Sequence, residues 1–303
     1  MIMFSWRMHG ITGESRYFDV IEHTLYNHYF GAIALNGKGT FYYNPMRMVG
    51  DQSKHSDHGH WPVSSRRMLP KINRTACCPS NMWRFFGALP EYLFSYDKDG
   101  LLVNLYTSST VDHTLADGRR IALSIATEYP HNGDITVRFE GKNPATFNLR
   151  LRIPGWCESA TAQWPGQKKK TVKSGEYLAI DRAWKKGDAV QLRFEMPVRM
   201  NLPDPRVEAN AGQVVFARGP VLFCLKKEDV DFPVEKAKVT ARPESVEQQV
   251  KSEWHPDLLD GIHVLSLPGQ VEDKSVELKL VPWSVRANRS TDSRWVVFLP
   301  LAD

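Results

Sequence analysis

The chain has 303 residues, of which 42% are hydrophobic, so it is long enough to bury the cores of two or three domains. Its formal net charge of +5 is small for this length, and its basic residues are mostly interspersed with acidic ones, which argues against a nucleic-acid-binding protein. No segment approaches the roughly 20 apolar residues of a membrane span, and no signal-peptide core opens the chain. With four cysteines in all, these features predict a soluble protein of a reducing, cytoplasmic compartment.

Two helices are predicted at the start of the chain. Residues 1–8 are apolar and begin without a polar cap, as in the middle of a longer helix. Between residues 14 and 30 the apolar residues recur at the spacing of one helix face. They are Tyr17, Phe18, Ile21, Leu25 and Tyr29.

The Asn36-Gly37 pair, followed by an aromatic run, predicts a hairpin within residues 34–45. The rings of this run are expected mainly in a core. Sugar-binding sites also use aromatic rings as platforms, so Tyr42 or Tyr43 could contact the substrate, and Tyr43 is the candidate. Residues 46–76 look irregular, and a loop of this length indicates either a functional loop or disorder.

Within that loop, carboxylate and imidazole side chains are dense but follow no recognised metal-ligand spacing. They are Asp51, His55, Asp57, His58 and His60. A solvated polar loop explains them best, and a substrate-contacting loop or direct metal ligation are the alternatives.

The adjacent pair Cys77-Cys78 follows the loop. Neighbouring Cα atoms are about 3.8 Å apart and a disulfide wants about 4.4–6.8 Å, so the two thiols do not readily bond to each other. The residues alone leave open two buried hydrophobic side chains, a metal site or a thiolate nucleophile. Ser80 is a candidate N-cap, which would place the pair just before a helix, and Pro90 should bend or end that helix early.

Beyond residue 96 the apolar period changes to two, which predicts strands over 102–107, 119–127, 135–140, 146–153, 177–181 and 189–196. Short strands separated by Gly, Pro and Asp turns favour a β-sandwich. A second β-rich block covers residues 212–225 and resumes near 276–300, after a Pro-rich passage at 197–205. We therefore expect three domains, at residues 1–95, 96–197 and 198–303.

Three smaller features complete the pattern. The run Lys168-Lys169-Lys170 lies between glycines and is interpreted as a solvated hairpin tip. Cys157 and Cys224 are expected to be buried thiols without a metal. Dinucleotide, phosphate-loop and hydrolase-elbow motifs are absent from the sequence.

Several short motifs in the same order resemble glycoside hydrolase family 127, the β-L-arabinofuranosidase group. Each motif alone is weak, and their order along nearly the whole chain makes the resemblance specific. The motifs are residues 12–27 (TGESRYFDVIEHTLYN), 41–45 (FYYNP), 77–81 (CCPSN) with Arg84, 151–156 (LRIPGW), 196–199 (MPVR), 204–206 (DPR), 218–220 (RGP) and 287–289 (ANR).

The resemblance implies an α+β multidomain protein, with the C-terminal end of an (α/α) barrel followed by β-sandwich domains. It implies retaining hydrolysis of terminal β-L-arabinofuranosyl or related sugars of plant-derived oligosaccharides or glycoconjugates. Carried over by position, Cys77 is the nucleophile and a Zn²⁺ ligand, and Cys78 is a second Zn²⁺ ligand. The family's acid/base glutamate and its other zinc ligands precede the segment that begins here at Met1. An upstream segment would complete the barrel, and we expect the isolated chain to be inactive.

Two other classes remain open at this stage. The β-sandwiches could serve a non-catalytic carbohydrate-binding or structural protein in which the cysteines only pack. The vicinal thiols could instead serve a redox or metal-sensing protein. Neither a nucleic acid nor a membrane is expected as a partner.

Overall fold

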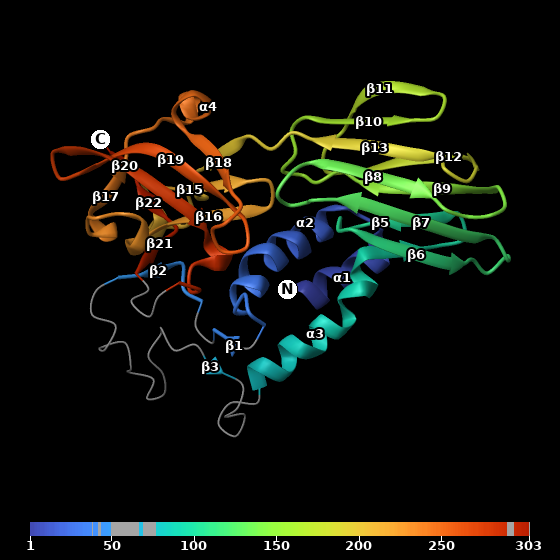
Figure 1. The fold of residues 1–303 in the computed structure, drawn as a ribbon, viewed down its shortest axis with the longest axis horizontal. Helices are drawn as coiled ribbons and strands as arrows, with labels where there is room; N and C mark the ends of the chain where they lie inside the picture. The colour runs from blue at the N-terminus through green and yellow to red at the C-terminus, as the bar shows by residue number, and fades with distance from the viewer. Residues whose placement is uncertain (38, 42–43, 50–66, 69–76, 290–293, 303) are drawn as a thin grey trace. The chain divides into compact units, whose positions relative to one another are not determined.

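The computed structural model describes residues 1–37, 39–41, 44–49, 67–68, 77–289 and 294–302. It is mostly β-sheet with few helices (Figure 1). The chain divides into two compact units, the first made of residues 1–24 and 82–196 and the second of residues 25–81 and 197–303. No helix in the described ranges is long and apolar enough to cross a membrane.

Both N-terminal helices are confirmed. Helix α1 spans Ile2–Thr12 and ends at Gly13, whose φ of 70° is the left-handed conformation typical of a helix C-cap. Helix α2 spans Arg16–His23, and the chain continues as a π-helix over Thr24–Tyr29. Its predicted apolar face is buried, since Phe18 and Ile21 have no exposed surface.

Helix α3 spans Cys77–Leu93, so its predicted start was wrong and the helix does not end at Pro90. It begins at Cys77 rather than after Ser80, because a proline is tolerated in the first turn, where its missing N–H has no intrahelical acceptor. It also continues past Pro90. The buried Tyr92 ring packs 5.2 Å from Trp6 and 5.1 Å from Phe85, which offsets the lost hydrogen bond in the last turn.

The first unit contains two sheets. One has the order β11-β10-β13-β8-β7-β6, and the other has the order β12-β9-β5-β4. Neighbouring strands are antiparallel except β5 and β9. The strands are β4 Phe94–Tyr96, β5 Gly100–Val103, β6 Ser109–Thr114, β7 Arg120–Thr127, β8 Asp134–Phe139, β9 Ala145–Arg152, β10 Ala160–Trp164, β11 Gln167–Val172, β12 Tyr177–Trp184 and β13 Ala189–Phe194.

Aromatic side chains pack between these two sheets. Phe139 of β8 lies 5.9 Å from Phe147 of β9, and Phe147 lies 5.8 Å from Trp184 of β12. The Trp184 indole N–H donates to the Phe147 carbonyl at 3.1 Å, so this buried ring has no unsatisfied donor. The two sheets therefore share one apolar layer.

All six strands predicted for this region are present, with shifted ends, and four others were missed. The missed strands are β4, β6, β10 and β11. The lysine run was wrongly interpreted as a loop: Lys168, Lys169 and Lys170 lie on the edge strand β11 and are exposed. The turn is at Gly166, whose φ is 82°. An edge strand with few apolar residues leaves no period-two pattern to detect.

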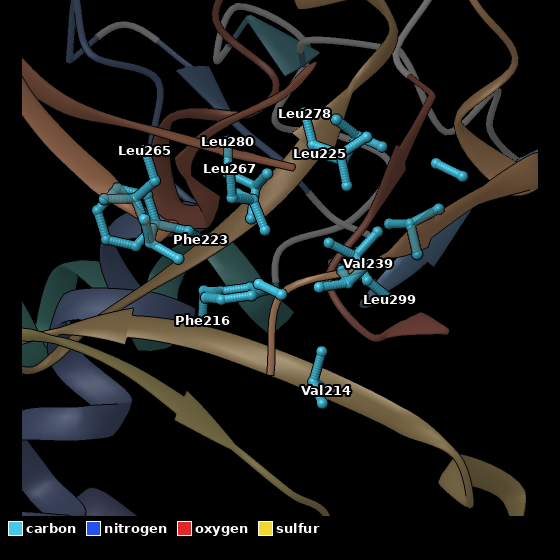
Figure 2. Close-up of a cluster of buried hydrophobic side chains, with 14 of the residues drawn as sticks. Val214, Phe216, Phe223, Leu225, Val239, Leu265, Leu267, Leu278, Leu280 and Leu299 are labelled. Atoms are coloured by element: carbon cyan, nitrogen blue, oxygen red, sulfur yellow. The ribbon is translucent and has the colours of Figure 1, made fainter. Parts of the chain in front are cut away.

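The second unit is built on a sheet with the path β14-β15-β16-β20-β19-β17, to which the other strands attach. Its apolar core includes Phe216, Phe223, Leu225, Leu265 and Leu280, which converge in Figure 2. The strands are β2 Arg47–Met48, β14 Val198–Asn201, β15 Gln213–Arg218, β16 Val221–Lys226, β17 Ala237–Val239, β18 Lys251–His255, β19 Ile262–Val271, β20 Lys274–Pro282, β21 Trp295–Val296 and β22 Leu299–Pro300. A short helix, α4, spans Val246–Gln249.

The predicted hairpin is present in its first half. Ile33 and Thr40 form an antiparallel bridge around a turn in which Gly37 has a φ of 66°. Strand β1 (Gly39–Thr40) then pairs with β3 (Arg67–Met68), which lies within the segment expected to be irregular. The aromatic continuation at Tyr42 and Tyr43 lies outside the described residues.

Candidate functional site

The cysteine pair occupies the first turn of α3. The structure describes the backbone of Cys77 and Cys78 and not their side chains. The first N–H groups of a helix lack intrahelical acceptors, and the helix dipole favours negative charge at this end. A thiolate is the reactive and metal-binding form of cysteine. The first turn of α3 therefore suits a cysteine that acts as a nucleophile or one that binds a metal.

The other sequence-predicted site residues are not brought together with the pair by the described structure. Tyr43 and the polar cluster from Asp51 to His60 lie outside the described residues. Among the residues that are described, no group of three or more His, Cys, Asp or Glu side chains is arranged to hold a metal ion. The zinc site therefore remains a prediction.

Cys157 and Cys224 are buried free thiols, as predicted. The Cys157 thiol donates to the Ser159 carbonyl at 3.3 Å. Burial raises the pKa of the Cys224 thiol to about 12, so it is protonated at neutral pH. Neither thiol is suited to nucleophilic chemistry.

Two of the family-like motifs meet in the first unit, where helix α2 contacts the end of strand β9. Arg152 and Glu22 are both buried and form an ion pair, and Arg152 also binds Asp19 at 2.6 Å. Glu22 accepts further hydrogen bonds from the Tyr129 hydroxyl at 2.7 Å and the Trp156 indole at 3.0 Å. Motif 12–27 is thereby fastened to motif 151–156.

The electrostatics of this cluster favour a structural role. Burial opposes the charge on Arg152, but the Glu22 and Asp19 carboxylates raise the pKa of the guanidinium above its ordinary value. Burial also raises the pKa of Asp19, and the Arg152 guanidinium opposes that shift. Glu22 is 1% exposed and accepts three hydrogen bonds, from Tyr129, Arg152 and Trp156, so this carboxylate is committed to contacts within the fold.

A second polar chain extends from the same arginine. Arg152 donates from Nε to the Asn104 carbonyl at 2.5 Å. The Asn104 side-chain oxygen accepts from the Tyr177 hydroxyl at 2.6 Å, and that hydroxyl lies 3.0 Å from Nε2 of the buried His9. Helix α1 is thus joined to β12 and to the loop after β5 by partly buried hydrogen bonds.

In the second unit, Asn27 performs a comparable function. Its amide donates to the Pro220 carbonyl at 2.8 Å, and its side-chain oxygen accepts from the Leu222 N–H at 2.7 Å. Both bonds are buried. The last residue of motif 12–27 therefore holds the turn at residues 219–220, within motif 218–220.

Arg286 is a second fully buried polar anchor of this unit. It donates to the Gly31 and Trp283 carbonyls at 3.2 and 3.0 Å and to the side-chain oxygen of Asn44. Its guanidinium lies 4.4 Å from the Trp283 ring, and burial lowers its pKa to about 10.

These polar anchors were not identified from the sequence. For Glu22 a signal existed, because the residue falls on the same helix face as Phe18, Ile21 and Leu25, where a carboxylate requires a buried partner. Nothing in the sequence identifies Arg152 as that partner.

Comparison with protein families decides the affiliation of the chain. Residues 1–91 match the β-L-arabinofuranosidase GH127 catalytic domain, residues 100–196 the GH127 middle domain, and residues 198–300 the glycoside hydrolase family 127 C-terminal domain. The chain belongs to glycoside hydrolase family 127. The resemblance inferred from the motifs is confirmed.

Curated and solved relatives of this GH127 chain agree. It is 28% identical over 281 residues to a non-reducing end β-L-arabinofuranosidase of Bifidobacterium longum, a match that covers 88% of this chain and 40% of the relative. It is similar to a solved GH127 β-arabinofuranosidase, with 32% identity, a TM-score of 0.85, and coverage of 99% of this chain and 48% of that one. A GH127 β-L-arabinofuranosidase of Geobacillus stearothermophilus T6 gives 28% identity, a TM-score of 0.86 and the same coverage. The chain thus spans about half the length of these relatives.

Proposed function

We propose that this chain is part of a retaining glycoside hydrolase that releases terminal β-L-arabinofuranosyl or related sugars from plant-derived oligosaccharides or glycoconjugates. The observation that carries the proposal is the match of residues 1–91 to the GH127 catalytic domain, with Cys77 and Cys78 in the first turn of α3. The names of its relatives support the choice of sugar.

The proposed architecture is the end of an (α/α) barrel in residues 1–95, followed by β-sandwich domains in residues 96–197 and 198–303. Helices α1, α2 and α3 supply the barrel part. The separate middle-domain and C-terminal-domain matches support the later boundaries, and the two sheets that share an apolar layer support a sandwich.

Zinc fits the donor chemistry of the adjacent cysteines, because thiolates are preferred ligands of Zn²⁺. Cys77 and Cys78 would hold the ion, with the remaining ligands supplied by residues outside this chain. When bound, the ion would keep the Cys77 thiol ionised at neutral pH.

In the proposed reaction, the Cys77 sulfur forms a bond to the anomeric carbon as the glycosidic C–O bond breaks. The departing oxygen takes a proton from a general acid, which we expect the family's upstream segment to supply. Water then attacks the same carbon, loses a proton to the conjugate base of that acid, and the C–S bond breaks with return of the electron pair to sulfur. Two inversions leave the configuration retained.

The exposed apolar side chains of α1 and α3 support the proposal that further helices complete the barrel. Phe4 and Ile11 of α1 are 60% and 79% exposed, whereas Ser5 and His9 of the same helix are buried. On α3, Trp83 and Phe86 are 43% and 49% exposed. Helices with apolar side chains on their outer faces are typical of segments buried on several sides. We propose that upstream helices cover these faces, and that without them the chain binds zinc weakly and is inactive.

The test joins this chain to an upstream segment of a GH127 relative and measures zinc content together with release of L-arabinose from a β-L-arabinofuranoside. The joined protein should bind zinc and hydrolyse the substrate. Cys77→Ser should abolish hydrolysis, Cys78→Ser should weaken zinc binding, and the control Cys224→Ser should leave the zinc content unchanged. Full activity of a Cys77→Ser protein would refute the proposal.

A further inference from the structure

Two buried N–H groups of the second unit find no acceptor in the part of the chain that the structure describes. They are Nε–H of Arg286 and Nε1–H of Trp283. Both side chains are 1% exposed or less. A buried donor without an acceptor destabilises the fold, so two of them side by side require a physical explanation.

The two donors belong to groups that stack on each other. The Arg286 guanidinium lies 4.4 Å from the centre of the Trp283 ring, and we call this contact the Arg286–Trp283 stack. The Trp295 ring flanks the same guanidinium at 5.1 Å, but its indole N–H donates to the Pro45 carbonyl at 2.8 Å. Because the two unsatisfied donors lie on neighbouring groups, one small acceptor beside the stack would serve both.

The guanidinium of Arg286 has only uncharged partners in the described ranges. It donates to the Gly31 and Trp283 carbonyls and to the side-chain oxygen of Asn44. Burial lowers its pKa to about 10, so it still carries its charge at neutral pH. A buried positive charge without a negative partner is costly.

The neighbouring cations, in contrast, are each paired with a carboxylate. Lys226 is fully buried and binds Glu228 at 2.7 Å, and Arg289 is paired with Asp229. Both lie near Arg286, since all three cations lower the pKa of the same buried thiol on β16. The local balance therefore leaves one positive charge, that of Arg286, uncompensated.

The stack lies close to solvent although its own side chains are buried. His28 is exposed, and the centre of its ring is 6.1 Å from that of Trp283. One exposed side chain thus separates the indole from water. A small solute can reach the unsatisfied donors by displacing this imidazole.

The charge balance selects among the possible acceptors. A water molecule would accept both hydrogen bonds but leave the guanidinium charge uncompensated. A divalent anion would leave an excess negative charge in the core. A monovalent anion accepts both bonds and balances the charge, and a weakly hydrated one such as chloride loses the least hydration on burial.

We propose that the Arg286–Trp283 stack binds a small monovalent anion of the chloride class, which accepts hydrogen bonds from Nε of Arg286 and Nε1 of Trp283. The anion is a structural ligand of the second unit, and its binding stabilises the folded chain by mass action. This inference goes beyond the proposed hydrolase and does not rest on it.

The test follows thermal unfolding of the 303-residue chain by circular dichroism while sodium chloride replaces sodium gluconate at constant ionic strength. The melting temperature of the parent should rise with chloride and then level off, as expected for a saturable site. Trp283→Phe keeps a ring beside Arg286 and removes the indole N–H. The chloride concentration that gives half of the rise should therefore increase about tenfold or more in this variant.

Trp295→Phe is the matched control. It changes the other ring beside Arg286, and the N–H that it removes is already bound by the Pro45 carbonyl. The melting temperature of this variant should fall in both salts, and its chloride dependence should stay that of the parent.

Chloride NMR gives a second measurement that needs no variant. The parent should broaden the chloride resonance, and bromide, which has the same charge and a similar size, should remove the excess broadening. If Trp283→Phe does not fold, this measurement decides alone.

Three results would overturn the inference. They are a parental melting temperature that is the same in chloride and gluconate, an unchanged chloride dependence in Trp283→Phe, and a chloride resonance that the parent does not broaden.

Discussion

Glu22 and Arg152 lie 130 residues apart in the chain and form an ion pair in which neither side chain is more than 1% exposed. A buried charge of either sign is costly when it stands alone, and each partner here removes that cost for the other. The pair connects a helix to a strand through the two most extensive family-like motifs.

Removing the arginine should destabilise the chain strongly. Arg152→Met leaves Glu22 and Asp19 without their cation, and we expect unfolding to become easier by about 3–5 kcal/mol. Urea denaturation followed by circular dichroism measures this. The exposed pair of Arg120 and Asp112 is the control, because water screens this pair and Arg120→Met should change the denaturation midpoint far less than Arg152→Met. Equal losses in the two variants would contradict the structural role of the buried pair.

Asn27→Ala should cost about 1–3 kcal/mol, because it leaves the buried Leu222 N–H and Pro220 carbonyl without their partner. Asn201→Ala removes a weaker contact, at 3.5 Å from the Val215 carbonyl, and should cost less. Denaturant midpoints of the two variants, measured side by side, give the comparison. A harmless Asn27→Ala would mean that the turn does not depend on this side chain.

Substitutions of two neighbouring phenylalanines of α3 should change stability to very different extents. Phe85 is 4% exposed and packs on Tyr92, so Phe85→Ala should lower the free energy of unfolding by about 3–5 kcal/mol. Phe86 is 49% exposed, and Phe86→Ser should change it by about 0.5 kcal/mol or less. Phe86→Ser should also reduce binding of a hydrophobic dye to the folded chain. If Phe86→Ser instead unfolds the chain, the described exposure of this helix face is wrong.

Stability should fall as the solution becomes more acidic than about pH 6.5, in part because of His9. Burial lowers the pKa of His9 in the folded chain below its ordinary value of 6.5. The unfolded chain therefore binds a proton first as the pH falls, and stability is lost between pH 6.5 and the lower folded-state pKa. His9→Gln should flatten this part of the curve of unfolding free energy against pH. His255→Gln, at an exposed position, should leave the parental slope. An unchanged slope in His9→Gln would show that His9 does not contribute.

Thiol titration separates the buried cysteines from the pair. Cys157 and Cys224 are about 1% exposed or less, so they should react with a disulfide reagent only after denaturation. The double variant Cys157→Ser/Cys224→Ser should keep the number of fast-reacting thiols of the parent, while the number found in denaturant falls from four to two. A decrease in the fast phase would show that at least one of these two thiols is accessible.

Elements with a one-sided apolar pattern were predictable from the sequence, and elements without one were not. In β9 the buried Phe147, Leu149 and Leu151 alternate with half-buried polar residues, and the strand was found. Strand β18 is exposed along its whole length and was missed. The start of α3 was misplaced because Pro79-Ser80 resembles a helix start, although the first turn of a helix tolerates proline at other positions too.

The candidate site was predictable only in its residue types. Cys77 and Cys78 stand out because adjacent thiols are unusual. Their position in the first turn of a helix is one that favours a thiolate. The contacts that hold the motifs together join residues more than 100 positions apart, such as Asn27 with Leu222 at a separation of 195. Local periodicity carries no information on such pairings, because it reports only which face of an element is apolar.

The distance along the chain between Glu22 and Arg152 also has a consequence for biosynthesis. Translation delivers helix α2 long before the arginine that neutralises its buried carboxylate, and the indole of Trp156 emerges later still. Until then Glu22 lacks its buried cation, and of its partners in this cluster only Tyr129 has been made. The complete Glu22 cluster can therefore assemble only after Trp156 has been synthesised, when most of the first unit has already been made.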